Sequence, residues 1–128
     1  MLWYNVRCNR LLTRMGGIMK FSETGDTLYC SFADRLDGFV CSEVEHELVS
    51  RTTEFKNERT NVRLIFDLSG VVFVSSAFLR LCLMHLKAFG KDCFFVTNVS
   101  DELHKVFHIS GFGDIMNVLH SDTTPALA

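Results

Sequence analysis

Two short stretches near the beginning of the chain alternate apolar and polar residues with the period of a β-strand. They are residues 18–22 and 27–32, and the turn-forming sequence Thr-Gly-Asp at 24–26 separates them. The apolar residues on one face of the second stretch are Leu28, Cys30 and Phe32. We therefore predict two strands joined by a tight turn, with these three side chains in the core.

The pattern becomes helical after Asp37-Gly38, which marks a break between two regular elements. Apolar residues between 39 and 55 recur three or four positions apart, as on the buried face of a helix. They are Cys41, Val44, Leu48 and Phe55. The charged residues Glu43, Glu45, Glu47 and Arg51 are predicted to lie on the other faces. The segment 39–55 is therefore expected to be an amphipathic helix.

Two later runs, residues 62–68 and 93–97, are short and almost wholly apolar, which is typical of strands covered on both faces. Ser69-Gly70 ends or interrupts the first run. A helix at 77–89 lies between the runs, so we predict adjacent, parallel central strands connected by that helix. Its face bearing Ala77, Arg80, Met84 and Lys87 is expected to be accessible near the helix start.

The end of the chain adds one helix and one strand. Ser100 is suited to cap a helix that Gly111 ends, and residues 115–119 form a last strand or extended segment. Strands that alternate with helices in this way indicate an α/β domain. We predict a mixed, mainly parallel sheet of about four to five strands with interleaved helices, spanning residues 18–128.

Residues 1–17 form an N-terminal extension that we place outside the domain. Its arginines, Arg7, Arg10 and Arg14, break up each apolar run, which does not fit a secretory signal. A short basic amphipathic anchor is the alternative interpretation. A chain that starts at Met19 is expected to melt at the same temperature as the full chain.

Composition narrows the possible functions. Of the 128 residues, 48% are hydrophobic and 22% charged, as in a globular domain. The net charge of −2 provides no basic field for nucleic acid, and no apolar run reaches the length of about 18 residues that would make the protein integral to a membrane. The five cysteines contain no C-x-x-C pair, which favours reduced thiols and a cytoplasmic location.

Signals for catalysis, metals or cofactors are poor. Ser75 and Ser76 stand at a strand-to-helix turn but lack the glycines of a hydrolase nucleophile elbow, so helix capping is the preferred interpretation. His104 and His108 are four residues apart on one helix, but no third metal ligand is evident, and surface histidines are preferred. No glycine loop supports nucleotide binding. We predict no catalytic residue, no metal and no cofactor.

The sequence from 64 to 81, LIFDLSGVVFVSSAFLRL, resembles the STAS domain of bacterial anti-sigma factor antagonists. That family shows a strand ending in Asp-Leu-Ser-Gly-Val, followed by an Asp-Ser-Ser-Gly-Leu motif in which Thr or Ala often replaces the second serine. Leu36-Asp37-Gly38 is similar to the family's Leu-Asp turn, and FFVTNVSDELHKVFHISGFGDIMNV is similar to its last strand, helix and glycine stop. The resemblance runs from about Met19 to the C-terminus.

The resemblance implies a transcription regulator that works by partner switching. Such antagonists bind an anti-sigma factor, a histidine-kinase-like ATPase, and phosphorylation at the start of the helix breaks the complex. Here Ser75 stands at the family Asp, Ser76 at the first serine, Ala77 at the usual phospho-acceptor and Phe78 at the family Gly. The usual switch is therefore expected to be missing, and Ser75 and Ser76 are the alternative acceptors.

We predict a non-enzymatic regulator that binds an anti-sigma factor or a related regulatory protein. The predicted partner-binding residues are Asp37, Ser75, Ser76, Ala77, Phe78 and Arg80. Phe78 is expected to be an apolar anchor at the surface. The alternative is a STAS subunit of a membrane-associated lipid-transport ATPase complex. The oligomeric state stays open at this point.

Overall fold

The computed structural model describes residues 18–120 of the chain. The predicted N-terminal extension therefore lies outside the described residues, as do residues 121–128. The elements in chain order are β1 (Met19–Thr24), β2 (Thr27–Leu36), α2 (Gly38–Glu58), β3 (Arg63–Val74), α3 (Ser76–Phe89), the 3-10 turn η1 (Lys91–Cys93), β4 (Phe94–Val99), α4 (Asp101–Ile109), the 3-10 turn η2 (Phe112–Asp114) and β5 (Asn117–His120).

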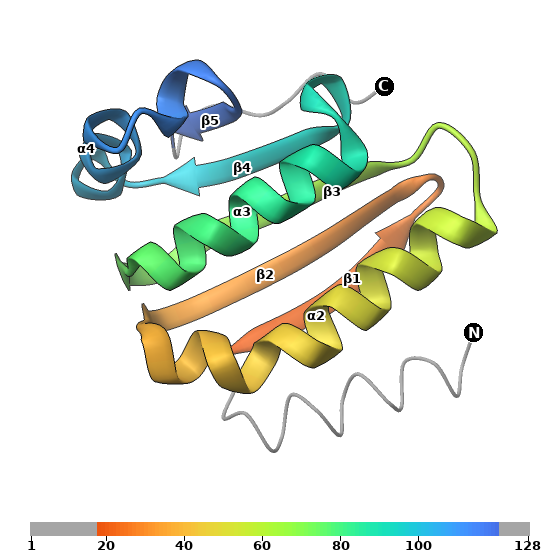
Figure 1. Cartoon of the computed structure of the whole chain (residues 1–128), viewed down its shortest axis with the longest axis horizontal. Helices are drawn as coiled ribbons and strands as arrows, with labels where there is room; N and C mark the ends of the chain where they lie inside the picture. Colours follow the sequence, from red (N-terminus) through yellow and green to blue (C-terminus); the bar gives the residue numbers. More distant parts are fainter. Residues whose placement is uncertain (1–17, 121–128) are drawn as a thin grey trace.

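The five strands form one sheet in which the spatial order β1-β2-β3-β4-β5 is also the chain order. β1 and β2 are antiparallel, whereas the other three neighbouring pairs are parallel. The predicted mixed, mainly parallel sheet is confirmed, and so is the parallel central pair, in which Leu64 is opposite Phe94. Figure 1 shows α2 and α3 side by side over one face of the sheet.

β3 is longer than predicted because Ser69-Gly70 does not interrupt it. Gly70 pairs with Ala33 of β2, and a β-carbon at Gly70 would stand 3.4 Å from the Ala33 Cβ. The glycine therefore permits close approach of two strands rather than ending one of them. The longer strand carries the chain to Val74, which pairs with Leu36 at the end of β2.

Phenylalanine rings fill the space between the sheet and the helices. The Phe66 ring centroid lies 5.1 Å from that of Phe32 and 5.0 Å from that of Phe94, both in edge-to-face contact. Edge-to-face pairs stabilise a core beyond the apolar area that they bury. Leu28, Cys30 and Phe32 are buried as predicted.

Arg51 corrects one prediction, because its side chain lies on the buried face of α2 and is only 2% exposed. It follows Leu48 by three residues, so it belongs to the same helical stripe. Its guanidinium lies 4.4 Å from the centroid of the Phe21 ring and 4.0 Å from a Glu23 carboxylate oxygen. The long arginine stem covers apolar surface while the charge meets an aromatic face and a carboxylate.

Candidate functional site

The carboxyl ends of β2 and β3 meet at one edge of the sheet, and a helix begins directly after each strand. Asp37 follows β2 and caps α2, with its Oδ1 accepting a hydrogen bond from the Val40 amide at 2.9 Å. Ser75 follows β3 and caps α3, with its Oγ accepting from the Phe78 amide at 3.4 Å. Both helix starts lie on the left in Figure 1. We call the surface that they form the helix-start surface; its residues are Asp37, Gly38, Phe39, Ser75, Ser76, Ala77 and Arg80.

One backbone carbonyl ties the two helix starts together. The Leu36 oxygen accepts a hydrogen bond from the Ser75 amide at 3.0 Å and a second one from the Ser75 hydroxyl at 2.8 Å. It also accepts a weak one from the Cys41 thiol, with Sγ at 3.7 Å. The Ser75 hydroxyl donates to Leu36 and accepts from Phe78, so it has a structural role at the junction.

The thiols beneath this surface are unsuited to nucleophilic chemistry. Burial raises the pKa of the Cys41 thiol and the nearby Asp37 raises it further, while the hydrogen bond with Ser75 and the charge of Arg80 lower it. Burial also raises the pKa of Cys82 well above its ordinary value. Since the thiolate is the reactive form, both side chains serve as core packing.

The structure brings most of the predicted partner-binding residues together. Asp37 and Ser75 are half-buried by their capping roles, and Ala77 is half-buried beside them. Ser76 and Arg80 are exposed on the outer side of α3. Five of the six predicted residues therefore have at least part of their side chains accessible on one surface.

Phe78 is the exception, and the prediction that it is a surface anchor is wrong. Its side chain is 0% exposed, and its ring centroid lies 5.1 Å from that of Phe32 and 6.0 Å from that of Phe66. As the third residue of α3 it precedes the buried Cys82 by four positions, so both side chains face the sheet. The large residue at the family glycine position therefore fills the core.

Phe39, which sequence reasoning missed, is the exposed aromatic side chain of the helix-start surface. It is the second residue of α2 and is 75% exposed. Because it precedes Cys41 by two positions, about 200° of helical rotation separates it from the buried stripe. That angle was available in the sequence, but it becomes informative only once the first residue of the helix is known.

A buried pair that the sequence did not indicate holds α2 against α3. The Thr52 Oγ lies 3.0 Å from the His85 Nε2, and the His85 Nδ1 lies 2.7 Å from the Leu81 carbonyl oxygen. Burial lowers the pKa of His85, which favours the neutral ring. In the neutral ring Nδ1–H donates to the Leu81 carbonyl and Nε2 accepts from the Thr52 hydroxyl. The Val49 carbonyl, 3.2 Å from the Thr52 Oγ, is a second acceptor for the same hydroxyl proton.

His104 and His108, which the sequence placed four residues apart on one helix, are in different surroundings in the structure. His104 stacks on His120 of β5, with ring centroids 4.0 Å apart, and Nδ1 of His120 lies 3.4 Å from an Asp101 carboxylate oxygen. His108 is exposed. Within residues 18–120, no group of three or more His, Cys, Asp or Glu side chains is arranged to hold a metal ion, and no helix is long and apolar enough to cross a membrane.

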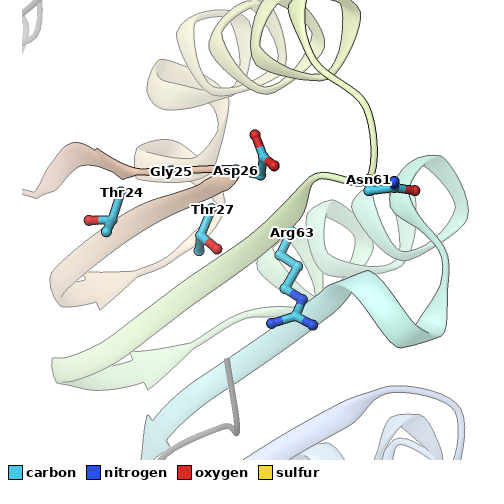
Figure 2. Close-up of a pocket in the computed structure, with 6 residues that line it drawn as sticks. All are labelled: Thr24, Gly25, Asp26, Thr27, Asn61 and Arg63. Atoms are coloured by element: carbon cyan, nitrogen blue, oxygen red, sulfur yellow. The ribbon is translucent and has the colours of Figure 1, made fainter. Parts of the chain in front are cut away.

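A polar pocket of about 360 Å³ lies at the opposite end of the sheet from the helix-start surface. It is formed by the β1–β2 turn and the start of β3; the lining residues are Thr24, Gly25, Asp26, Thr27, Asn61 and Arg63. Figure 2 shows that the side chains of Asp26 and Arg63 point in different directions rather than toward a common centre. The pocket therefore lacks the convergent polar groups of a small-molecule site.

Comparison with known proteins bears on the fold. No family model and no curated protein matches the sequence. Among solved structures, the unphosphorylated anti-sigma factor antagonist SpoIIAA is 18% identical, with a TM-score of 0.62 over 81% of this chain and 90% of that one. An anti-sigma factor antagonist (STAS) domain protein from Planctomyces limnophilus is also 18% identical, with a TM-score of 0.60 over 80% of this chain and 89% of that one.

The phosphorylated form of SpoIIAA from Bacillus is similar as well. It is 18% identical and gives a TM-score of 0.57 over 81% of this chain and 93% of that chain. This chain has the STAS fold. The resemblance noted from the motif at 64–81 is thus confirmed at the level of fold.

Proposed function

We propose that this protein is a non-enzymatic, protein-binding regulator of the anti-sigma factor antagonist type, and that its partner is an anti-sigma factor kinase with a histidine-kinase-like ATPase domain. The observation that carries the proposal is the pair of helix starts joined at the Leu36 carbonyl. This junction holds Asp37, Ser76 and Arg80 on one rigid surface of a STAS fold. Rigid presentation of a surface lowers the entropic cost of binding a folded partner.

The proposed regulator lacks the phosphorylation switch of its family. Ala77 has no hydroxyl, and the Ser75 hydroxyl is held between Leu36 and the Phe78 amide. Ser76 is exposed, but it stands one residue away, which is a rotation of about 100° on a helix. A kinase site shaped for the side chain at 77 would therefore meet the Ser76 hydroxyl in the wrong direction.

Binding is tested with the purified anti-sigma factor kinases of the organism that encodes this chain, measured by isothermal titration calorimetry. We expect one of them to bind. Ala77→Asp should weaken that complex, because it adds a charge to a close interface, whereas the uncharged Ala77→Asn serves as the control for size. Binding to the ATPase subunit of a lipid transporter and to none of the kinases would support the transport alternative instead.

The missing switch is tested by incubating the complex with Mg-ATP and measuring intact mass. Wild-type protein and Ser76→Ala should gain no phosphate and should stay bound. Ala77→Ser restores the hydroxyl at the family position, so we expect it to gain one phosphate and dissociate. Stoichiometric phosphate on Ser76 of the wild-type protein, with loss of binding, would show that the switch has moved by one residue.

A further inference from the structure

We infer that Phe39 is the apolar anchor of the helix-start surface, and that the partner presents an apolar socket for this ring with a carboxylate that pairs with Arg80. The inference rests on the proposed function, because it assumes that this surface binds a folded protein. It assigns to Phe39 the role that the sequence had suggested for Phe78.

Phe39 contributes little to the fold. With 75% of its surface exposed, the ring lies on the side of α2 opposite the buried residues Cys41 and Val44. The helix start is already satisfied without it, since Asp37 caps the Val40 amide. A partner that buried the ring would gain affinity from the apolar area that is removed from water.

The position of Phe39 corresponds to the position of Ala77. Each is the second residue of its helix, and in both helices the third residue, Val40 or Phe78, packs against the core. Asp37 and Ser75 cap α2 and α3 at the same edge of the sheet. Phe39 therefore faces the same side of the molecule as Ala77, which stands at the family's phospho-acceptor position. A partner that covers the start of α3 at Ala77 therefore meets the start of α2 at the same edge of the sheet.

The surroundings of Phe39 leave room for a partner. A β-carbon built on the preceding Gly38 meets no atom within 4 Å, so another backbone can approach beside the ring. Arg80 is exposed in the second turn of α3, whose cap Ser75 is hydrogen-bonded to Leu36 just before α2, and it forms no ion pair with any residue in the described range 18–120. An apolar ring and an unpaired guanidinium on the same surface are complementary to a partner with an apolar socket and a nearby carboxylate.

The other large exposed apolar side chains of residues 18–120 lie elsewhere. Ile109 and Ile115 flank the turn after α4, Met84 borders a groove between α2 and α3, and Val72 projects from β3 where the register shifts against β2. Ile109 is 83% exposed. It therefore provides a matched control: a similarly exposed apolar side chain on another helix, away from the helix-start surface.

The test is the affinity of Phe39→Ala for the kinase that binds the wild-type protein. Truncation of an interface anchor is expected to raise the Kd about thirtyfold or more, while Ile109→Ala should change it less than about threefold. Thermal unfolding of both variants should match the wild type, because neither side chain is buried. If the kinase binds Phe39→Ala as tightly as the wild type, the inference fails while the proposed function stands; if no kinase binds the wild type, both fail.

Three further measurements identify the kind of partner. Arg80→Glu should weaken kinase binding and reduce its dependence on salt, while Lys87→Glu, on the same face of α3 two turns away, should have a smaller effect. Binding of the wild-type protein, but not Phe39→Ala, to vesicles of anionic phospholipid in place of the kinase would assign the ring to a membrane surface and overturn the inference. Loss of self-association on Phe39→Ala, with kinase binding intact, would assign it to a second copy.

Discussion

The first turns of α2 and α3 are built alike, yet they place their phenylalanines in opposite environments. Each follows a polar side chain that accepts a hydrogen bond from the amide of the helix's third residue. Each also carries a phenylalanine within three residues of this capping side chain. Phe78, in third place, is 0% exposed, whereas Phe39, in second place, is 75% exposed. One step along a helix is a rotation of about 100°, which is enough to decide whether an aromatic ring supports the fold or is available to a partner.

The largest expected difference between the two turns is in the free energy of unfolding. Phe78→Ala removes a ring that contacts Phe32 and Phe66, and should destabilise the protein by about 3–5 kcal/mol. Phe39→Ala should change stability by less than about 0.5 kcal/mol. Urea unfolding followed by circular dichroism measures both. Equal losses would mean that the two rings are not in different environments.

The second prediction concerns what holds α2 against α3 beyond their first turns. Thr52→Val leaves the buried His85 Nε2 without its donor and should cost about 1–3 kcal/mol. Thr53→Val is the matched control, because Thr53 is exposed on the same helix turn and should have little effect. Urea unfolding decides the result, and an equal cost at both positions would exclude a specific role for the Thr52–His85 pair.

The two serines at the start of α3 should behave as differently as the two phenylalanines. Ser75→Ala removes a helix cap and the hydrogen bond to the Leu36 carbonyl, so it should cost about 0.5–2 kcal/mol. Ser76→Ala removes an exposed hydroxyl and should stay within about 0.5 kcal/mol of the wild type. A thermal shift for Ser76→Ala as large as that for Ser75→Ala would contradict the assignment of Ser75 as the structural serine.

The smallest expected effect is a pH dependence of stability caused by His85. Its pKa is lowered in the folded protein, so below the ordinary histidine pKa of about 6.5 the unfolded chain binds a proton that the folded chain does not. Stability should therefore fall as pH drops below about 6.5, by at most about 1.4 kcal/mol per pH unit. His85→Gln should reduce this slope, whereas the exposed His46→Gln should keep it. An unchanged slope in His85→Gln would show that other groups cause the dependence.

Much of the fold followed from local patterns. The apolar runs around Leu64 and Phe94 are short and buried on both faces, so periodicity and length were enough to predict parallel central strands. The caps at Ser75 and Ser100 were recognisable because a polar residue directly precedes an apolar helical pattern. These features depend on neighbours in the sequence.

The wrong and missing predictions all depend on packing between distant segments. Arg51 was placed outside because charge usually means exposure, but Phe21 and Glu23, on a strand far away in the sequence, accept its charge at the core margin. Phe78 was assigned to a partner because it stands at the family glycine position beside the expected docking surface, and the motif does not say which side of α3 meets the sheet. The Thr52–His85 pair was not predicted because it depends on how two helices are placed relative to one another, and no local sequence pattern specifies that placement.

The agreement between strand order in space and strand order in the chain has a consequence for how the protein folds. Every neighbouring pair of strands is joined by a single hairpin or by one helical crossover. No strand has to be inserted between two that have already paired, so each pairing closes only the single hairpin or crossover that joins its two strands. During synthesis each newly emerged helix and strand can dock on the edge left by the previous one. Once α3 has left the ribosome, Ser75 and Cys41, the residues that donate hydrogen bonds to the Leu36 carbonyl, are both available, so the junction between the two helix starts can form.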